Sequence, residues 1–261
     1  SNWAFDTEPM DGLGGRIGYQ PRGRGMGGSS AINGMVYIRG NAWDYDNWAA
    51  LGCTGWSWDE VLPVFRRQED NQRGANEFHG QGGPLHVSNL ISPSPVGEAF
   101  VEAASRLQLP RNDDFNGARQ DGFGMYQVTQ YKGERWSAAR AFIDPLAGKP
   151  NLSVRTGALV EKIVIEQGRA TGVEVRFGDR RETIRAKGGV VLSAGAFGSP
   201  QILMLSGIGP GAHLRDHGIA TLVDKPAVGA DLQDHCDYLV GYELDDLSLF
   251  GGSLRGLMKV A

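Results

Sequence analysis

The glycine-rich segment 23–34, GRGMGGSSAING, is the feature that most limits how this chain can fold. Gly23, Gly25 and Gly28 match the spacing G-x-G-x-x-G, which is typical of a dinucleotide-binding turn that a buried strand enters and a helix leaves. The residues before it include Pro21 and several arginines, which do not suit a buried strand. No acidic residue closes a second strand about 20 residues further on. We therefore interpret the spacing as coincidental.

The same segment predicts a phosphate site of another kind. Gly27 and Gly28 would let the backbone approach a ligand closely. Ser29 and Ser30 can cap a short helix whose free N–H groups face an anion. The alternative for these four residues alone is an ordinary glycine turn with a helix cap.

Composition narrows the class of protein. The chain has 261 residues, of which 41% are hydrophobic, enough for one large or two small domains. Its formal charge of −4 and the lack of a basic run argue against nucleic-acid binding. No secretory signal and no apolar stretch of about 18 residues is present, so we predict no transmembrane segment. Cys53 and Cys236 lack a C-x-x-C spacing, and we predict a cytoplasmic protein, with peripheral membrane association left open.

Three helices are expected before residue 150. The first covers residues 57–70 and begins with a capping box of Ser57 and Glu60. The second runs from Ser94 to Pro110, and the third begins at Ser137. The inner face of the second helix is predicted from its apolar spacing, at Val96, Phe100, Ala104 and Leu107. Residues 1–56 are expected to be extended loop, and residues 71–87 a mobile loop or lid.

From Asn151 the pattern changes to short β-branched runs that predict a sheet. The expected strands are residues 152–156, 161–166, 171–177, 182–186 and 188–196. A helix should follow, with Ser199 as its N-cap, Pro200 in its first turn and Gly207 at its end.

Two long motifs resemble signatures of the glucose-methanol-choline (GMC) oxidoreductases. Residues 23–48, GRGMGGSSAINGMVYIRGNAWDYDNW, resemble the first signature, and residues 195–209, GAFGSPQILMLSGIG, resemble the second. The segment VGADLQDH at 228–235 follows in the expected order. The resemblance covers nearly the whole chain and comes closest to the choline and primary-alcohol dehydrogenase branch.

The resemblance implies a fold of two domains, both incomplete in this fragment. One is an α/β FAD-binding domain of the Rossmann-like GMC type, and the other is an α+β substrate domain with an antiparallel sheet. The expected parts are 1–89 for FAD and the flavin lid, 90–147 for substrate, 148–237 for FAD and 238–261 for the second substrate part. Family members carry a nucleotide-binding strand, turn and helix before the part that matches Ser1. Their catalytic histidine and its histidine or asparagine partner fall beyond Ala261, so no catalytic residue is assigned here and the fragment is expected to be inactive alone.

The implied chemistry is the oxidation of a primary alcohol, choline among the candidates, to the aldehyde. A histidine base takes the hydroxyl proton while hydride passes to flavin N5. Backbone amides along the isoalloxazine would stabilise the reduced flavin. The residues implied to contact FAD are Gly27, Gly28 and Ser29 at the pyrophosphate and ribityl, Asn33, Gly34, Met35 and Val36 along the isoalloxazine, Val160 at the adenine, and Ala194. Ile32 stands where some members attach FAD through a histidine, so we predict non-covalent FAD.

Several further side chains have both a functional and a structural interpretation. His235 falls near the flavin in the family, and Asp237 could pair with a quaternary ammonium, with ordinary loop hydrogen bonding as the alternative. The favoured role of the tryptophans is packing, and the alternative is an aromatic cage for a cation; the residues are Trp43, Trp48, Trp56 and Trp58. Nucleophilic roles are rejected for Ser199 and Ser206 because no G-x-S-x-G elbow is present. His213 and His217 are interpreted as a solvated helix end, since no H-E-x-x-H motif is formed.

Two other functions compete with alcohol oxidation. One is a non-catalytic remnant that binds flavin or a partner, and the other is lyase chemistry like that of the hydroxynitrile lyases, which resemble the same family. The sequence leaves open which alcohol is used, the electron acceptor and the oligomeric state.

Overall fold

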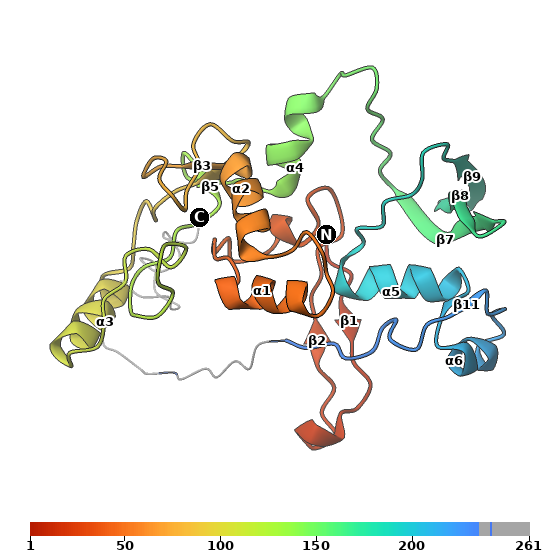
Figure 1. Ribbon diagram of the computed structural model, residues 1–261, viewed down its shortest axis with the longest axis horizontal. Coiled ribbons are helices and arrows are strands. Elements are labelled where there is room, and N and C mark those ends of the chain that lie inside the picture. Colours follow the sequence, from red (N-terminus) through yellow and green to blue (C-terminus); the bar gives the residue numbers. More distant parts are fainter. Residues whose placement is uncertain (235–240, 242–261) are drawn as a thin grey trace, which may run out of the picture. The chain divides into compact units, whose positions relative to one another are not determined.

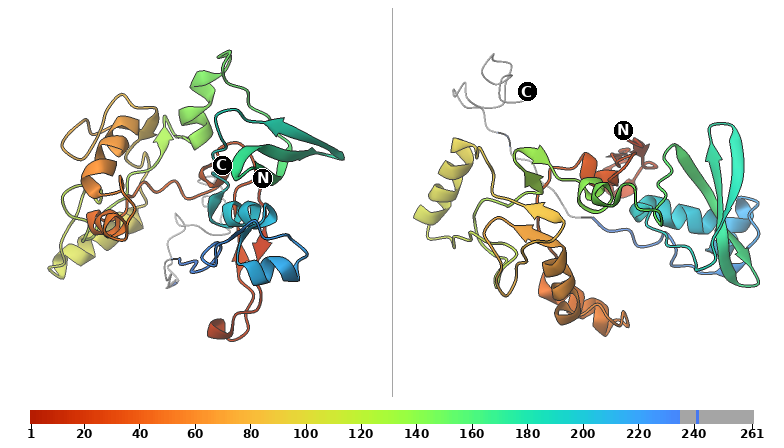
Figure 2. Two further views of the ribbon diagram at one scale, coloured as in Figure 1. Left: turned by 45° about the vertical axis from the view of Figure 1, so that its right-hand side comes forward. Right: turned by 90° about the horizontal axis from the view of Figure 1, so that it is seen from above.

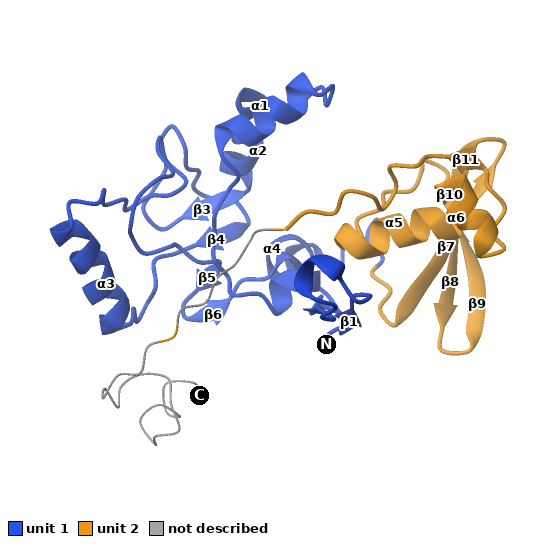
Figure 3. Cartoon of the chain, turned by 90° about the horizontal axis from the view of Figure 1, so that it is seen from below, with its two compact units in different colours: residues 1–153, 247–261 blue, residues 154–246 orange. Residues whose placement is uncertain are grey.

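The computed structural model describes residues 1–234 and Gly241. It divides them into two compact units, with residues 1–153 in unit 1 and Val154 beginning unit 2 (Figure 3). The elements of both units are labelled in Figure 1. In the described part of the chain, no helix combines the length and the apolar character needed to cross a bilayer.

Unit 1 consists of short helices joined by small strands and long ordered loops. Its elements are β1 (Phe5–Asp6), η1 (Asp11–Leu13), β2 (Tyr19–Gln20), η2 (Gly28–Ala31), α1 (Ala42–Ala50), α2 (Trp58–Gln68), β3 (Glu69–Asn71), β4 (Leu85–Val87), α3 (Pro95–Arg106), β5 (Gln130–Tyr131), β6 (Glu134–Arg135), α4 (Ala138–Phe142) and η3 (Asp144–Leu146).

The expectation that residues 1–56 are all extended loop is wrong, because α1 forms within them. Asn41 caps this helix: its side chain accepts from the Trp43 amide at 3.0 Å, while the Asp44 carboxylate accepts from the Asn41 amide at 2.7 Å. This reciprocal pair satisfies backbone donors that the first turn of a helix otherwise leaves free. The helix then packs through Tyr45 against α2.

Helix α2 begins as predicted. The Ser57 amide and hydroxyl donate to the Glu60 carboxylate at 3.0 and 2.6 Å. The helix ends at Gln68, earlier than expected, because Glu69 enters β3.

A two-stranded sheet of unit 1 is extended by isolated bridges. Strands β3 and β4 pair in parallel, with Glu69 opposite Leu85. Val128 bridges Ser88 on one side and Val36 on the other, both in antiparallel fashion. Residues 127–129 therefore link β4 to the segment that follows the glycine-rich turn.

The predicted mobile loop at 71–87 is instead an anchored part of this sheet. Two hydrogen bonds of 3.0 Å tie it to β3: the Asn71 amide donates to the Gly80 carbonyl, and the Gly83 amide donates to the Glu69 carbonyl. His79 is buried, and a Cβ at Gly80 would overlap the Arg66 carbonyl. Glycine here allows close backbone packing rather than mobility.

Helix α3 forms where expected, but its buried face agrees with the prediction only in part. Val101 and Ala104 are buried, and Gly97 lies against Met125, whereas Phe100 is 64% and Leu107 is 74% exposed. The packed positions share one helical face at spacings of four and three. The prediction is therefore confirmed at Ala104 and wrong at Phe100 and Leu107, because glycine and alanine allow the closer contact.

Unit 2 is an antiparallel meander with two helices. Its elements are β7 (Ala158–Glu166), β8 (Arg169–Phe177), β9 (Arg180–Arg185), α5 (Gly195–Leu205), β10 (Ile208–Gly209), α6 (Gly211–Asp216) and β11 (Val223–Asp224). Strands β7, β8 and β9 pair in that order, and Figure 2 shows them beside α5. Ile163 and Val175 are buried within the meander.

Three of the predicted strands are formed, but residues 152–156 and 188–196 are not strands. They find no strand partner among the described residues, and Val191 is 93% exposed. Helix α5 begins at Gly195 rather than after Ser199. The Ser199 hydroxyl accepts from the Ala194 amide at 3.0 Å, so it bonds back across the first turn from inside the helix. Gly207 follows the helix end with φ of 83°, as predicted.

Candidate functional site

The glycine-rich segment forms a single tight turn in unit 1. Gly27 precedes η2 with φ of 87°, so Ser29 and Ser30 lie inside the turn and are not its caps, contrary to expectation. The Ser30 hydroxyl donates to the Gly27 carbonyl at 2.5 Å and accepts from the Ala138 amide at 2.9 Å. The turn is thereby fixed to the start of α4.

The glycines of this turn have two distinct roles. A Cβ at Gly27 would lie 3.2 Å from the Ser137 hydroxyl, and a Cβ at Gly23 would overlap the Gly28 carbonyl. These two glycines are therefore needed for packing within the protein. At Gly28 and Gly34, a Cβ would have nothing within 4 Å of it, so the small size of these two residues leaves open space beside the backbone.

Arg135 and Asn33 hold the backbone that leaves the turn. The Arg135 guanidinium donates to the Ser30 carbonyl at 3.2 Å and to the Asn33 carbonyl and side-chain oxygen at 2.7 and 2.9 Å. The Asn33 side chain also accepts from the Met35 amide at 3.1 Å, which accompanies a φ of 61° at Met35. The chain is thus directed into the sheet in a fixed conformation.

Val36 lies at an open edge of that sheet. Two hydrogen bonds of 2.9 Å, from Tyr37 to the Gln127 carbonyl and from Thr129 to the Met35 carbonyl, flank the pair of Val36 with Val128. In such a pair the N–H and C=O of Val36 point away from Val128. Neither the Val36 nor the Gly34 amide has an acceptor within the described residues. The stretch from Gly27 to Val36, which we call the glycine-rich bed and, where FAD binding is proposed, the flavin bed, therefore offers free donors beside open space. This arrangement fits a planar ligand with acceptor atoms.

Val160 and Ala194 belong to unit 2. Val160 is half-buried opposite Val175, at the point where the register of β7 and β8 shifts. Ala194 is exposed at the start of α5. The structure thus brings Gly27, Gly28, Ser29 and Asn33 to Val36 into one continuous stretch of unit 1.

The remaining predicted residues have structural surroundings or lie outside the described part. His235 and Asp237 fall outside the described residues. Rings of the tryptophan set pack around Tyr45, with centroids 5.5 Å from Trp48 and 5.6 Å from Trp58, which confirms the packing role for these two. Trp56 follows at 5.8 Å from Trp48, while Trp43 is 68% exposed.

The histidine pair and Ser206 also agree with the non-catalytic interpretation. His213 and His217 are exposed at the end of α6 with ring centroids 4.6 Å apart. The Ser206 hydroxyl accepts from the Ile163 amide at 2.8 Å and donates to the Ile202 carbonyl. These two hydrogen bonds of Ser206 join the end of α5 to β7.

A buried charged cluster next to the bed was missed by the sequence analysis. Glu69 is fully buried and contacts the Arg39 guanidinium and His79 Nδ1, both at 2.9 Å, while His79 Nε2 lies 2.9 Å from the Asp114 carboxylate. Burial alone would raise the pKa of Glu69, but hydrogen bonds from His79, Gly80 and Asn71, together with Arg39, lower it. Burial would likewise lower the pKa of His79, but its two carboxylate partners raise it.

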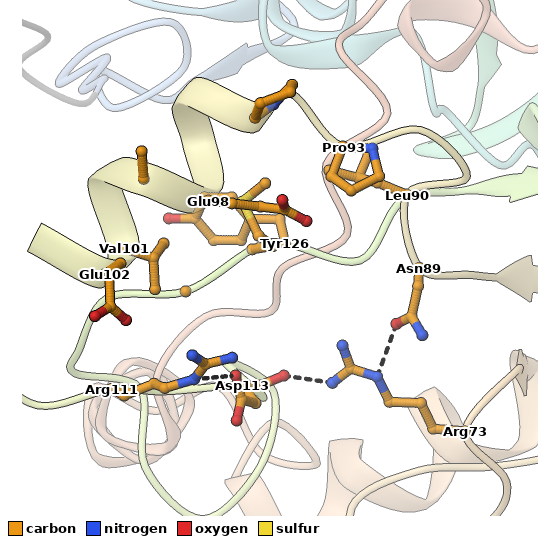
Figure 4. Close-up of a pocket in the computed structure, with 14 residues that line it drawn as sticks. Arg73, Asn89, Leu90, Pro93, Glu98, Val101, Glu102, Arg111, Asp113 and Tyr126 are labelled. Atoms are coloured by element: carbon orange, nitrogen blue, oxygen red, sulfur yellow. Dashed lines mark hydrogen bonds and ion pairs between the residues drawn. The ribbon is translucent and has the colours of Figure 1, made fainter. Parts of the chain in front are cut away.

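A separate hollow of about 680 Å³ lies beside α3 (Figure 4). Arg111 is paired with the Asp113 carboxylate at 2.9 Å, while Arg73 donates at 2.8 Å to the neutral side chain of Asn89. No residue from Gly27 to Val36 lines this hollow. It is therefore distinct from the glycine-rich bed.

Comparison with known proteins agrees with the two sequence motifs. Residues 10–237 match the GMC oxidoreductase family. The chain is 47% identical over 237 residues to an oxygen-dependent choline dehydrogenase of Sinorhizobium fredii, covering 91% of this chain and 43% of the relative. The chain thus spans less than half the length of the curated relative that it matches.

Solved structures give the same result for the fold. Pyridoxine 4-oxidase from Mesorbium loti superposes with a TM-score of 0.82 at 36% identity, over 86% of this chain and 45% of that chain. An FAD-dependent oxidoreductase from Chaetomium thermophilum superposes with a TM-score of 0.80 at 30% identity, over 87% of this chain and 42% of that chain. The chain belongs to the GMC oxidoreductase family and has its fold.

Proposed function

We propose that the chain supplies part of the FAD site of an enzyme that oxidises a primary alcohol, with choline as the first candidate substrate. The observation that carries this proposal is the stretch from Gly27 to Val36, where free amides of Gly34 and Val36 stand beside open space on a rigid backbone. The family match and the naming of the Sinorhizobium relative as a choline dehydrogenase support the substrate class.

FAD, when bound, accepts hydride from the carbinol carbon of the alcohol. The amides of Gly34 and Val36 would donate hydrogen bonds to the flavin edge and stabilise negative charge there. Arg135 keeps this backbone in place through the Ser30 and Asn33 carbonyls. Val160 is proposed to contact the adenine, and Ala194 is proposed to lie close to the cofactor. The division into FAD and substrate parts at residues 89, 147 and 237 stays a prediction.

FAD is proposed to bind without a covalent bond. Ile32, which is 38% exposed, occupies the position where some members carry the attaching histidine, and its side chain has no nucleophilic atom. Acid precipitation of the holoenzyme should therefore release all of the flavin into the supernatant. Flavin that stayed with the pellet would contradict this part of the proposal.

The function is tested on the complete product of the reading frame that carries this sequence, purified with its flavin. Choline or another primary alcohol added without oxygen should bleach the flavin absorbance, and aldehyde should form in equal amount. Air is then admitted to distinguish the possible electron acceptors. Recovery of the flavin colour identifies oxygen as the acceptor, whereas a flavin that stays bleached indicates a quinone or another acceptor. A yellow protein that stays oxidised with every alcohol would favour the lyase, and a protein without flavin would favour the remnant.

A further inference from the structure

The hydrogen bonds of the buried charged cluster, Arg39, Glu69, His79 and Asp114, converge on the backbone just after the proposed flavin bed. Both nitrogens of the His79 ring face carboxylates, Glu69 at Nδ1 and Asp114 at Nε2. Asn71 Nδ2 also lies 3.0 Å from Nδ1, but its two hydrogens are donated to Glu69 and Gln127. A neutral imidazole can donate from only one nitrogen. The arrangement therefore suits the doubly protonated ring, which balances two cations against two carboxylates.

One arm of the cluster runs from His79 Nδ1. Glu69 accepts from the Arg39 guanidinium at 2.9 Å and from the Asn71 side chain at 2.9 Å. The Asn71 amide group then exchanges hydrogen bonds of 3.0 and 3.1 Å with Gln127. The Gln127 carbonyl accepts from the Tyr37 amide, so this arm ends on the strand that contains Val36.

The other arm runs from His79 Nε2 through Asp114. The second oxygen of Asp114 accepts from the Asn116 amide at 3.1 Å. The Asn116 side chain donates to the Tyr37 carbonyl at 2.9 Å and accepts from the Arg39 amide at 2.7 Å. Both arms therefore hold residues 37–39, which directly follow Val36.

We propose that His79 is a positioning residue for the flavin bed, which in its doubly protonated form fixes the backbone of residues 37–39, next to Val36, through Glu69 and Asp114. This inference rests on the proposed FAD binding. Loss of the second proton would remove one donor and leave a carboxylate facing a ring lone pair. One of the two arms would then lose its hydrogen bond to His79. The Val36 amide would then be less well placed toward FAD.

The direction of the pH effect follows from the charges around the ring. The groups that face His79 are Glu69, Asp114 and, across Glu69, Arg39; the Tyr37 hydroxyl lies 3.4 Å from Arg39, and burial raises its pKa, so it stays neutral. The pKa of His79 is raised in the folded state. The contribution of the doubly protonated ring to FAD affinity is therefore complete below the ordinary histidine pKa of about 6.5. It is lost as pH rises through the raised pKa of His79.

The test measures FAD affinity of the complete flavoprotein between pH 6 and pH 9, by flavin fluorescence after reconstitution. The wild type should bind FAD at least about tenfold more weakly at the high end, while its far-ultraviolet circular dichroism stays constant. Asp114→Asn removes the more exposed carboxylate and should move the midpoint of this loss downward by about one pH unit. The matched control is Asp113→Asn, the same change one residue earlier at a side chain that pairs with Arg111.

The outcomes are separable. A wild type that binds no FAD at pH 6 overturns the proposed function. A wild type that binds FAD equally well from pH 6 to pH 9 overturns the role of His79 alone, and this measurement needs no variant. If Asp114→Asn and Asp113→Asn leave the midpoint at the same pH as the wild type, the coupling through Asp114 is also refuted.

Discussion

Gly34 is the residue at which flavin contact can be separated from folding. Its φ lies outside the left-handed region, and nothing stands within 4 Å of a Cβ built there. Gly34→Val should therefore leave the folded protein undisturbed, while the branched side chain fills the space in front of the Gly34 and Val36 amides. We expect FAD affinity to fall by about tenfold or more, since overpacking costs about 1–3 kcal/mol. Titration of the apoprotein with FAD, beside its melting temperature, measures both effects.

The control for this variant is Gly12→Val. Gly12 lies in η1, and it too has an ordinary φ and open space around it. It is remote in sequence from the bed and should leave FAD affinity unchanged. Wild-type affinity in Gly34→Val would refute flavin contact at this position. Gly27 is unsuited to the same test, because its φ of 87° strains any side chain and a Cβ there would lie 3.2 Å from the Ser137 hydroxyl, whether or not FAD binds.

The residues missed by the sequence analysis show where single-sequence reasoning fails at this scale. Glu69 and His79 lie in polar stretches that predict surface, because an unpaired charge is rarely buried. Their burial is possible only because they are paired with each other and with Arg39 and Asp114. The last of these partners is 35 positions from His79, so the pairing depends on the tertiary fold and is invisible in any local window.

Elements were predictable where local signals decide them. The capping box of Ser57 and Glu60 and the glycine at 207 are short-range features, and both fixed helix ends as expected. The pair of Asn41 and Asp44 is a capping signal of the same kind, and it would have predicted the start of α1. Strands depend on partners, so β-branched runs such as 152–156 predict pairing that the described residues do not supply.

The contact between α5 and β7 gives a prediction at the scale of elements. Ser206, 6% exposed at the end of α5, is the acceptor for the Ile163 amide, and Ile163 is itself buried. Ser206→Ala would leave that N–H without a partner, which costs about 1–3 kcal/mol. Urea unfolding of the complete protein should show this loss of stability, with alcohol oxidation retained at temperatures where the variant stays folded.

Ser199→Ala is the comparison for this change. The Ser199 hydroxyl also accepts one backbone amide, from Ala194, but that site is exposed and water can replace the serine. Its loss should cost less than that of Ser206. Complete loss of turnover in a folded Ser206→Ala protein would instead revive a catalytic role for this serine.

At the scale of the whole molecule, the long motifs were more informative than composition or periodicity. They indicated the family and the stretch from Gly27 to Val36, whereas the division at Val154 follows from contacts that only the folded chain reveals. The described residues include several large apolar side chains that are exposed to water. Leu51 in unit 1 is 77% exposed, Leu107 is 74% exposed, and Val191 in unit 2 is 93% exposed.

This exposure predicts how the 261-residue chain behaves when it is produced alone. Burying one such side chain contributes about 2 kcal/mol, so three exposed positions forgo a large share of the roughly 5–15 kcal/mol that stabilises a typical domain. We expect the short chain to self-associate and to hold much less than one FAD per chain. Light scattering and the ratio of flavin to protein absorbance, measured beside the complete gene product, check both statements. A monomeric 261-residue chain with stoichiometric FAD would contradict this prediction and show that these residues alone form the cofactor site.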